Sequence, residues 1–286
     1  MYFWSIKKLI YIFLLCTIHS TVNAINNYVT DSTLSYNIIL VIGQSNTHYG
    51  LGYDSLLDIS SDQIKQLSYH ENDIIDAIEP LDNKTRRKNK IGFALNFAKY
   101  YINFFKEDTN KLLIIPNGVA NSGFSNHHWN KGDITYESSV NKVLYVLDKY
   151  PKSKLVAVLW HQGERDRTYN KLVDPVQFYS IPLSSYQIFL DRFINNIRDD
   201  LKNPSVPFVL GGMVPYWVQQ DSSRLIIQSV IKTTTKRIKR IGYADPEKPF
   251  LIQKRNPNND PAHFDAEGQR ELGVRYFLEY LRIFLQ

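Results

Sequence analysis

Short apolar runs alternate with longer amphipathic stretches along most of this chain, and that alternation limits the folds it can adopt. Five runs have the composition of strands, at 36–42, 111–116, 154–160, 206–211 and, more weakly, 241–244. Apolar residues at helical spacing lie between or after them, at 91–106, 136–150, 184–202, 222–239 and 264–285. Wholly apolar strands that alternate with helices predict a parallel sheet covered on both faces. We therefore expect an α/β fold, a doubly wound three-layer α/β/α sandwich of the flavodoxin type with about five strands.

The first 24 residues differ from the rest of the chain. A lysine pair precedes an apolar run over 9–18, and the small residues Val22 and Ala24 follow it. This is the three-part pattern of a secretory signal, and the run is short for a membrane span. The sequence predicts a signal peptide over 1–24 and a mature domain over 25–286, secreted or periplasmic, with no stable membrane anchor after cleavage. An uncleaved short anchor is the alternative interpretation.

Composition and charge exclude several classes of function. Hydrophobic residues make up 43% of the chain and charged residues 22%, as in globular proteins rather than disordered ones. The single cysteine, Cys16, lies in the predicted signal, so the mature chain has no thiol or disulfide chemistry. The net charge is +6, and the basic clusters 84–88 and 236–240 lack interleaved aromatic residues. We therefore expect no nucleic-acid partner.

Polar residues gather where ligands bind in such a sheet, beyond the carboxyl ends of the strands. Ser45 follows the first strand, two residues after Gly43. A serine held there can be a nucleophile if a base lies beside it, or it can simply cap a turn. Near the C-terminus, Asp260 stands three residues before His263, just ahead of the last helix. His263 could take the serine proton while Asp260 orients the imidazole, which predicts a Ser-His-Asp triad.

The segment after the third strand, 160–166, is also dense in polar groups. The side-chain amide of Gln162 is a suitable donor to an oxyanion, so we expect it to be catalytic. Glu164 and Asp166 lie beside it without triad spacing, and we expect them to support the loop. The pair His127-His128 lacks carboxylates at the spacing of a metal site, so no metal is predicted.

Together these segments resemble the sialate O-acetylesterase-like branch of the SGNH hydrolases, which includes acetyl xylan esterases. The matching blocks are Gly-Gln-Ser-Asn at 43–46, Trp160 with Gln-Gly-Glu-x-Asp at 162–166, and Asp-x-x-His-Phe at 260–264. The resemblance spans about residues 36–281. It implies a single SGNH-type esterase domain that removes O-acetyl groups from sialic acid or another acetylated carbohydrate, with a serine nucleophile and without a cofactor.

The resemblance also assigns roles around the triad. The backbone N–H groups of Ser45 and Gly123 would join the Gln162 side chain in the oxyanion hole, with Gly118 as an alternative to Gly123. Two neighbours of the nucleophile, Gln44 and Asn46, would support it. The tryptophans after the second and fourth strands, which could stack on sugar rings, are Trp129 and Trp217.

Two alternatives remain open at this stage. The same triad could act on peptidoglycan O-acetyl groups, on a lipid or on a thioester, or the chain could be a carbohydrate-binding protein that keeps the fold without turnover. A lone glycosylation sequon begins at Asn83.

Overall fold

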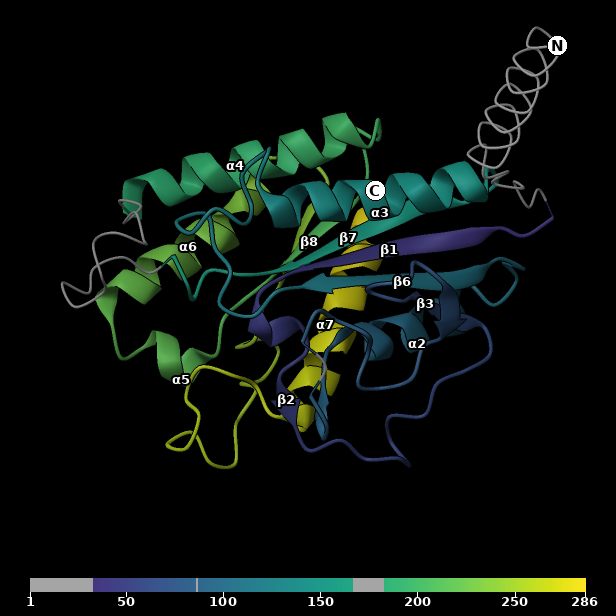
Figure 1. Ribbon diagram of the computed structural model, residues 1–286. Coiled ribbons are helices and arrows are strands. Elements are labelled where there is room, and N and C mark those ends of the chain that lie inside the picture. The colour runs from purple at the N-terminus through teal and green to yellow at the C-terminus, as the bar shows by residue number, and fades with distance from the viewer. Residues whose placement is uncertain (1–32, 86, 167–182) are drawn as a thin grey trace, which may run out of the picture.

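The apolar runs assemble into a seven-stranded sheet flanked by helices, in a computed structural model that describes residues 33–85, 87–166 and 183–286 (Figure 1). The predicted signal peptide lies outside these residues. In spatial order the strands of the sheet are β4 (Ile74–Asp76), β3 (Ile64–Leu67), β6 (Lys111–Gly118), β1 (Tyr36–Gly43), β7 (Lys154–His161), β8 (Phe208–Gly211) and β9 (Ile241–Ala244). A separate antiparallel pair is formed by β2 (Gly50–Leu51) and β5 (Lys90–Ile91).

The α/β prediction is confirmed, but the predicted number of strands was too small. The five expected strands form β1 and β6 to β9, all parallel to their neighbours. The sequence reading missed β3 and β4, where β4 pairs antiparallel with β3 at one edge. Both are short, and neither is a continuous apolar run, so they lack the composition of the buried central strands.

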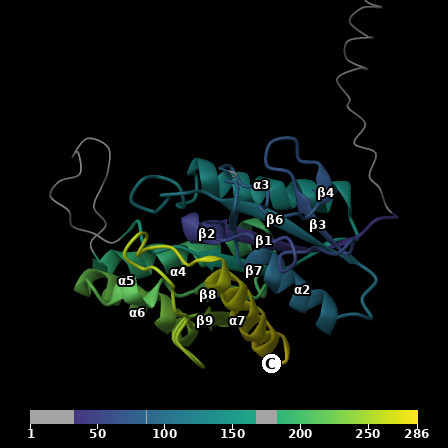
Figure 2. The same cartoon turned by 90° about the horizontal axis from the view of Figure 1, so that it is seen from below.

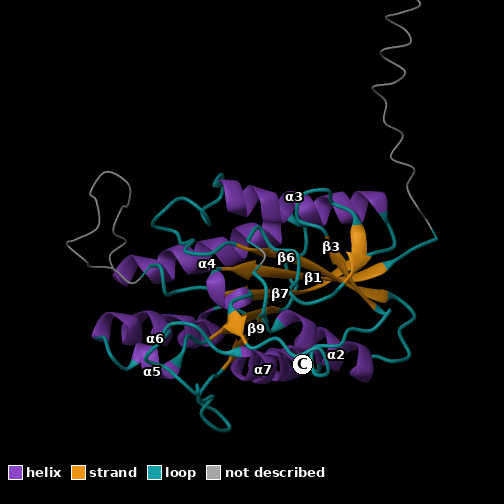
Figure 3. Ribbon diagram, turned by 60° about the horizontal axis from the view of Figure 1, so that its bottom comes forward, coloured by secondary structure: helices purple, strands orange, loops and turns teal. Residues whose placement is uncertain are grey.

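Helices cover both faces of the sheet, as Figure 3 shows by colour. Their bounds are η1 (Ser45–Thr47), α2 (Ala94–Phe104), α3 (Ile134–Lys149), α4 (Leu183–Asp200), α5 (Pro215–Val218), α6 (Ser222–Arg237) and α7 (Ala266–Phe284). In Figure 1, α3 and α4 lie on one side of the strands, and Figure 2 shows α2 and α7 side by side on the other. None of the helices within the described ranges is long and apolar enough to cross a membrane.

The close contact between α2 and α7 depends on Gly273. A Cβ atom there would lie 2.6 Å from the carbonyl oxygen of Phe93, at the start of α2. Any side chain at this position would push the two helices apart, so the sequence needs glycine in the middle of α7. This packing holds α7 against α2, and the first turn of α7 directly follows the segment that carries Asp260 and His263.

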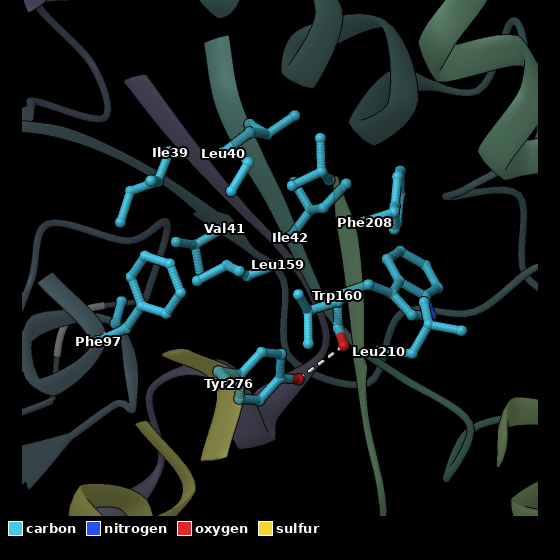
Figure 4. Close-up of a cluster of buried hydrophobic side chains, with 14 of the residues drawn as sticks. Ile39, Leu40, Val41, Ile42, Phe97, Leu159, Trp160, Phe208, Leu210 and Tyr276 are labelled. Carbon is cyan, nitrogen blue, oxygen red and sulfur yellow. Dashed lines mark hydrogen bonds between the residues drawn. The ribbon is translucent and has the colours of Figure 1, made fainter. Parts of the chain in front are cut away.

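The core surrounds the central strand, whose side chains alternate between the two faces (Figure 4). Val41 points to the side of Phe97 and Tyr276, whereas Ile42, the next residue, lies on the side of Trp160. The Tyr276 hydroxyl donates to the Trp160 carbonyl oxygen at 2.7 Å, which ties α7 to β7. The centre of the sheet is therefore a rigid support for the loops at its carboxyl edge.

Strand order places a crevice at the end of β1. The chain passes from β1 to β6 on one side and then to β7, β8 and β9 on the other, so the connections diverge beyond the end of β1. Gly43, the last residue of β1, pairs with Gly118 of β6 and His161 of β7, and the three ends lie at one edge. Ligands in doubly wound sheets bind at such a point. The asparagine of the glycosylation sequon, Asn83, is buried close to this edge, where its Oδ1 accepts from the Gly118 N–H, so it is not presented on the surface.

Candidate active site

A sharp turn presents Ser45 at the end of β1. Gly43 has φ 129°, and a Cβ atom there would lie 2.1 Å from the His161 carbonyl oxygen, so only glycine fits. That same oxygen accepts from the Gln44 N–H at 2.8 Å, which fixes the turn. Ser45 then begins η1, where the first N–H groups have no acceptor inside the helix. The turn thus leaves the Ser45 N–H and hydroxyl close together at the carboxyl edge.

Ser45, His263 and Asp260 form a connected relay across 218 residues of sequence. The Ser45 Oγ lies 2.8 Å from the His263 Nε2. The other ring nitrogen, Nδ1, lies 2.9 Å and 3.0 Å from the two carboxylate oxygens of Asp260. With Nδ1–H donating to Asp260, Nε2 is left as an acceptor for the serine proton. This is the geometry that activates a serine hydroxyl.

The surroundings keep the imidazole of His263 neutral near pH 7. Burial lowers its pKa below the ordinary histidine value, and the Lys90 and Lys254 cations act in the same direction. Asp260 opposes them by favouring the protonated form. The net lowering leaves a free Nε2 lone pair, which a general base requires.

Asn46, the residue after the nucleophile, connects it to the loop of His263. Its Nδ2 donates to the Ala262 carbonyl oxygen at 2.9 Å and to Glu164 Oε1, and its Oδ1 accepts from the Phe264 N–H at 3.1 Å. Both backbone neighbours of His263 are therefore held by one amide side chain. These hydrogen bonds are how Asn46 supports the nucleophile, and the buried Glu164 accepts one of them.

A pocket of about 410 Å³ opens over Ser45 and His263. It is lined by Gln44, Ser45, Tyr49, Ala120, Asn121, Glu164, Arg165, Trp217, Ala262 and His263. The Tyr49 ring stands 5.2 Å from the imidazole of His263, tilted by 35°. The volume lies in the range of pockets that bind small molecules.

The prediction that the Gln162 side chain lies in the oxyanion hole was wrong. Its amide is fully buried, and Nε2 donates to Asp166 Oδ2 at 2.8 Å, with longer contacts to Gln44 Oε1 and the Ser122 carbonyl oxygen. Its Oε1 accepts from the Tyr186 hydroxyl. The amide is used inside the protein and does not line the pocket.

Gly123 and Gly118 do not line the pocket either, and the N–H groups predicted for the oxyanion hole have internal acceptors. The Gly123 N–H donates to Asn126 Oδ1 at 2.7 Å, and the Gly118 N–H donates to Asn83. From the loop after β6, it is Ala120 and Asn121 that line the pocket. Asn121 has φ 61°, a conformation that favours glycine or asparagine. The glycine signal pointed two residues too far along the chain, to Gly123, because an asparagine, Asn121, occupies the left-handed position here.

Of the two tryptophans expected to stack on sugars, one was wrongly assigned. Trp129 is fully buried against Trp160, and its Nε1 donates to the Ser122 hydroxyl, so it is part of the core. Trp217 does line the pocket, with the Arg224 guanidinium 4.0 Å from its ring centre. Tyr49 is the aromatic that the sequence reading missed. Its only signal was its place four residues after Ser45.

The other residues predicted to support the site are buried and hydrogen-bonded. Asp166 accepts from the N–H groups of Phe124 and Ser125, both at 2.9 Å, which fixes the loop after β6. Gln44 Oε1 accepts from the Arg165 N–H at 3.0 Å. These contacts tie the loops after β1, β6 and β7 together.

The described residues contain no group of three or more histidine, cysteine, aspartate or glutamate side chains arranged to hold a metal ion. The His127-His128 pair diverges, since His128 Nδ1 contacts the Thr135 hydroxyl and His127 Nδ1 lies 3.9 Å from Asp133.

Comparisons with known proteins agree with the fold and with the family resemblance. A family model described as "Carbohydrate esterase, sialic acid-specific acetylesterase" matches residues 35–282. An Arabidopsis thaliana protein named "Probable carbohydrate esterase" is 26% identical over 216 residues, covering 73% of this chain and 71% of that protein. The resemblance inferred from the three sequence blocks is thereby confirmed.

Solved structures show the same fold at low identity. The structure of an Arabidopsis thaliana protein has a TM-score of 0.68 and 22% identity, covering 87% of this chain and 99% of that one. NanS has a TM-score of 0.70 and 19% identity, covering 88% and 98%. A carbohydrate acetylesterase from Xanthomonas citri has a TM-score of 0.61 and 14% identity, covering 86% and 56%.

Proposed function

Because this chain belongs to the carbohydrate esterase family of sialic acid-specific acetylesterases, we propose that it removes O-acetyl groups from a carbohydrate, with Ser45 as nucleophile. The observation that carries the proposal is the relay in which Ser45 Oγ lies 2.8 Å from His263 Nε2 and Asp260 holds the other ring nitrogen. The relay opens into a pocket, so its reactive oxygen can meet a substrate.

The first half of the reaction transfers the acetyl group to the enzyme. Ser45 Oγ attacks the ester carbonyl carbon while its proton passes to His263 Nε2. The resulting imidazolium is stabilised by Asp260. When the tetrahedral intermediate collapses, the sugar oxygen leaves and takes the proton from Nε2, which releases the sugar alcohol and leaves an acetyl-serine.

The second half returns the enzyme to its starting state. A water molecule gives a proton to His263 Nε2 and attacks the acetyl-serine carbonyl. Collapse of this intermediate releases acetate, and Ser45 Oγ regains the proton from the imidazolium.

Backbone N–H groups are the oxyanion donors that we assign in this chain. The Ser45 N–H at the start of η1 is one, and the segment Ala120–Asn121 across the pocket supplies the other. This assignment replaces Gly123 and the Gln162 side chain, both of which have internal partners. A donor of this kind contributes about 3 kcal/mol to transition-state stabilisation.

The charges beside the pocket favour an acidic sugar, such as sialic acid, over a neutral one. Lys90 Nζ lies 4.3 Å from the Tyr49 ring centre, Arg87 Nε donates to the Tyr49 hydroxyl at 2.8 Å, and Arg165 lines the pocket. The facing carboxyl of Glu164 is buried, which raises its pKa to about 7 and reduces its negative charge. Cations at the mouth attract a substrate carboxylate.

An acetate-release assay over a panel of substrates tests the proposal. The panel contains O-acetylated sialic acid, acetylated xylan and O-acetylated peptidoglycan, and a serine-directed phosphonate is used in parallel. We expect release from the acidic sugar with the highest kcat/KM and covalent labelling at Ser45. No release from any member, together with no labelling, would refute the esterase. A preference for xylan would refute only the acidic substrate.

Export of the protein is part of the proposal and rests on residues 1–24 alone. The lysine pair, the apolar run and Val22-x-Ala24 favour cleavage after Ala24. N-terminal sequencing of exported protein should begin at Ile25, and retention of Met1 would contradict it.

A further inference from the structure

The segment that carries Asp260 and His263 has no regular secondary structure. It runs from the end of β9 at Ala244 to the start of α7 at Ala266, and within it the backbone forms only turns and bends. Such a segment does not hold two side chains in register by backbone ladders of its own. Yet His263 is aligned with Ser45 on one side and with Asp260 on the other, so other groups must fix this backbone.

Two side chains, Asn46 and Lys254, hold the part of the segment that carries the triad residues. Asn46 binds it from the side of the nucleophile, at the Ala262 carbonyl and the Phe264 N–H. Lys254 Nζ donates to the backbone carbonyl oxygens of Asp260 and His263. Lys254 thus forms hydrogen bonds with the backbone carbonyls of both the triad acid and the triad base.

The environment of Lys254 suits this role. Its side chain is only 11% exposed, although a lysine usually extends into water. Its Nζ also lies 3.9 Å from Asp260 Oδ1, so the ammonium faces a carboxylate as well as two carbonyl oxygens. An ammonium group has three donors, and these acceptors can use all of them. The desolvated cation is therefore compensated within the 254–263 loop.

We propose that Lys254 is a positioning residue for the triad, closing the 254–263 loop onto itself so that Asp260 and His263 keep their alignment with Ser45. This inference rests on the proposed esterase function. Lys254 is not assigned any contact with substrate. It acts through the two triad residues whose carbonyls it binds.

The ammonium also acts on His263 through its charge. The ionisable groups facing the imidazole are Asp260 and Lys254 on its own segment, Lys90 on β5, His48 and Tyr49 after η1, and His161 at the end of β7. Burial lowers the pKa of His48 and of His161 to about 3, so both are neutral at the pH of catalysis. Two cations therefore oppose one carboxylate, and removing Lys254 raises the pKa of His263.

The test compares Lys254→Met, which removes donors and charge, with Lys254→Arg, which keeps both. We expect Lys254→Met to lower kcat/KM by about 10- to 100-fold, chiefly in kcat, because the triad loses its alignment. Its acid limb in the pH–rate profile should move to higher pH. Lys254→Arg should recover part of kcat and keep the acid limb near the wild-type position.

The matched control is Arg255→Met, which removes one positive charge at the adjacent residue. The Arg255 side chain is 87% exposed and pairs with Glu267, away from the triad carbonyls. We expect its kcat/KM and acid limb to equal those of the wild type. If Lys254→Met does not fold, Lys254→Gln takes its place, with the same expected movement of the acid limb.

A second measurement does not depend on turnover. The His263 imidazole can be titrated by NMR in the wild type and in each variant. Unchanged titration and an unchanged acid limb in the Met or Gln variant would overturn the proposal, even if activity fell, because lost stability alone would explain the fall. If the wild type releases no acetate from any substrate, the esterase function fails, while the titration still decides the role of Lys254.

Discussion

Two histidine–carboxylate pairs lie at the carboxyl edge of the sheet, and in both the partners are three residues apart in sequence. His161 and Glu164 follow β7, and Asp260 and His263 precede α7. In the first pair the side chains are 0% and 6% exposed, and His161 Nε2 stands 3.7 Å from Glu164 Oε1. In the second pair His263 is 23% and Asp260 41% exposed, with the closest atoms 2.9 Å apart.

Solvation explains why only the second pair can work as a dyad. Burial lowers the pKa of His161 to about 3 and raises that of Glu164 to about 7, so the environment drives both groups toward their neutral forms. Asp260 remains in contact with water, which can solvate a carboxylate, and it favours the protonated form of His263. A three-residue spacing brings a carboxylate and a histidine together. Exposure of the carboxylate to water then decides whether it stays charged and can stabilise the imidazolium.

The largest effect should come from removing the base of the more exposed pair, His263, or the nucleophile that it serves, Ser45. Ser45→Ala and His263→Ala should each lower kcat by at least about 10³-fold, since triad members act as a unit. The double variant should be little worse than either single one. Acetate release under single-turnover conditions measures the loss, and thermal unfolding checks that the fold is intact. Wild-type turnover by purified Ser45→Ala would remove the main support for the nucleophile.

A matched pair of amide substitutions compares the two carboxylates directly. Asp260→Asn should lower kcat by about 10²-fold or more, because the imidazolium loses its counter-charge and the ring its orientation. Glu164→Gln should change kcat far less, since a glutamine Oε1 can still accept from Asn46. Both are measured as kcat and KM on one acetyl ester. Equal losses in the two variants would break the distinction between the pairs.

The part of the site that the sequence made predictable is the part fixed by strand ends. Gly43 and Ser45 follow a continuous apolar strand, and an acid and a histidine precede the last helix, so topology alone suggests that they meet. The three sequence blocks then identified the family. The five apolar strands were found for the same reason, whereas β3 and β4 are too short and too mixed in composition to be recognised.

What sequence could not give is the direction in which a polar side chain points. Gln162 has the right chemistry for an oxyanion donor, but Asp166 captures its amide inside the protein. Trp129 has an aromatic face suited to a sugar, but a large residue in a tight loop can equally fill the core, and here it does. Lys254 gave no motif at all, because its partners are backbone carbonyls.

The pH dependence of activity should reflect the second pair, Asp260 and His263. His263 must be neutral to accept the serine proton, so kcat/KM falls as the pH drops through its pKa. Since burial and two cations lower that pKa, the half-loss should lie below about pH 6.5, the ordinary histidine value. A pH–rate profile on an uncharged acetyl ester measures it. A half-loss above that value would mean that Asp260 outweighs the burial and the cations.

The pH dependence of stability should instead reflect the buried pair, through Glu164. Its pKa is about 7 in the folded protein against an ordinary value of 4.5, so between these values the folded state holds a proton that the unfolded state releases. The stability contributed by the protonated group is therefore complete below about pH 4.5 and is lost as the pH rises toward 7. Glu164→Gln removes this titration.

The difference in unfolding free energy between wild type and Glu164→Gln should therefore change with pH in one direction. From pH 4.5 to 7 the wild type should lose up to about 3 kcal/mol of unfolding free energy relative to the variant. Urea unfolding at several pH values measures it. A flat difference for Glu164→Gln would mean that Glu164 is ionised in the folded protein, and the two pairs would then not differ in the way that their burial implies.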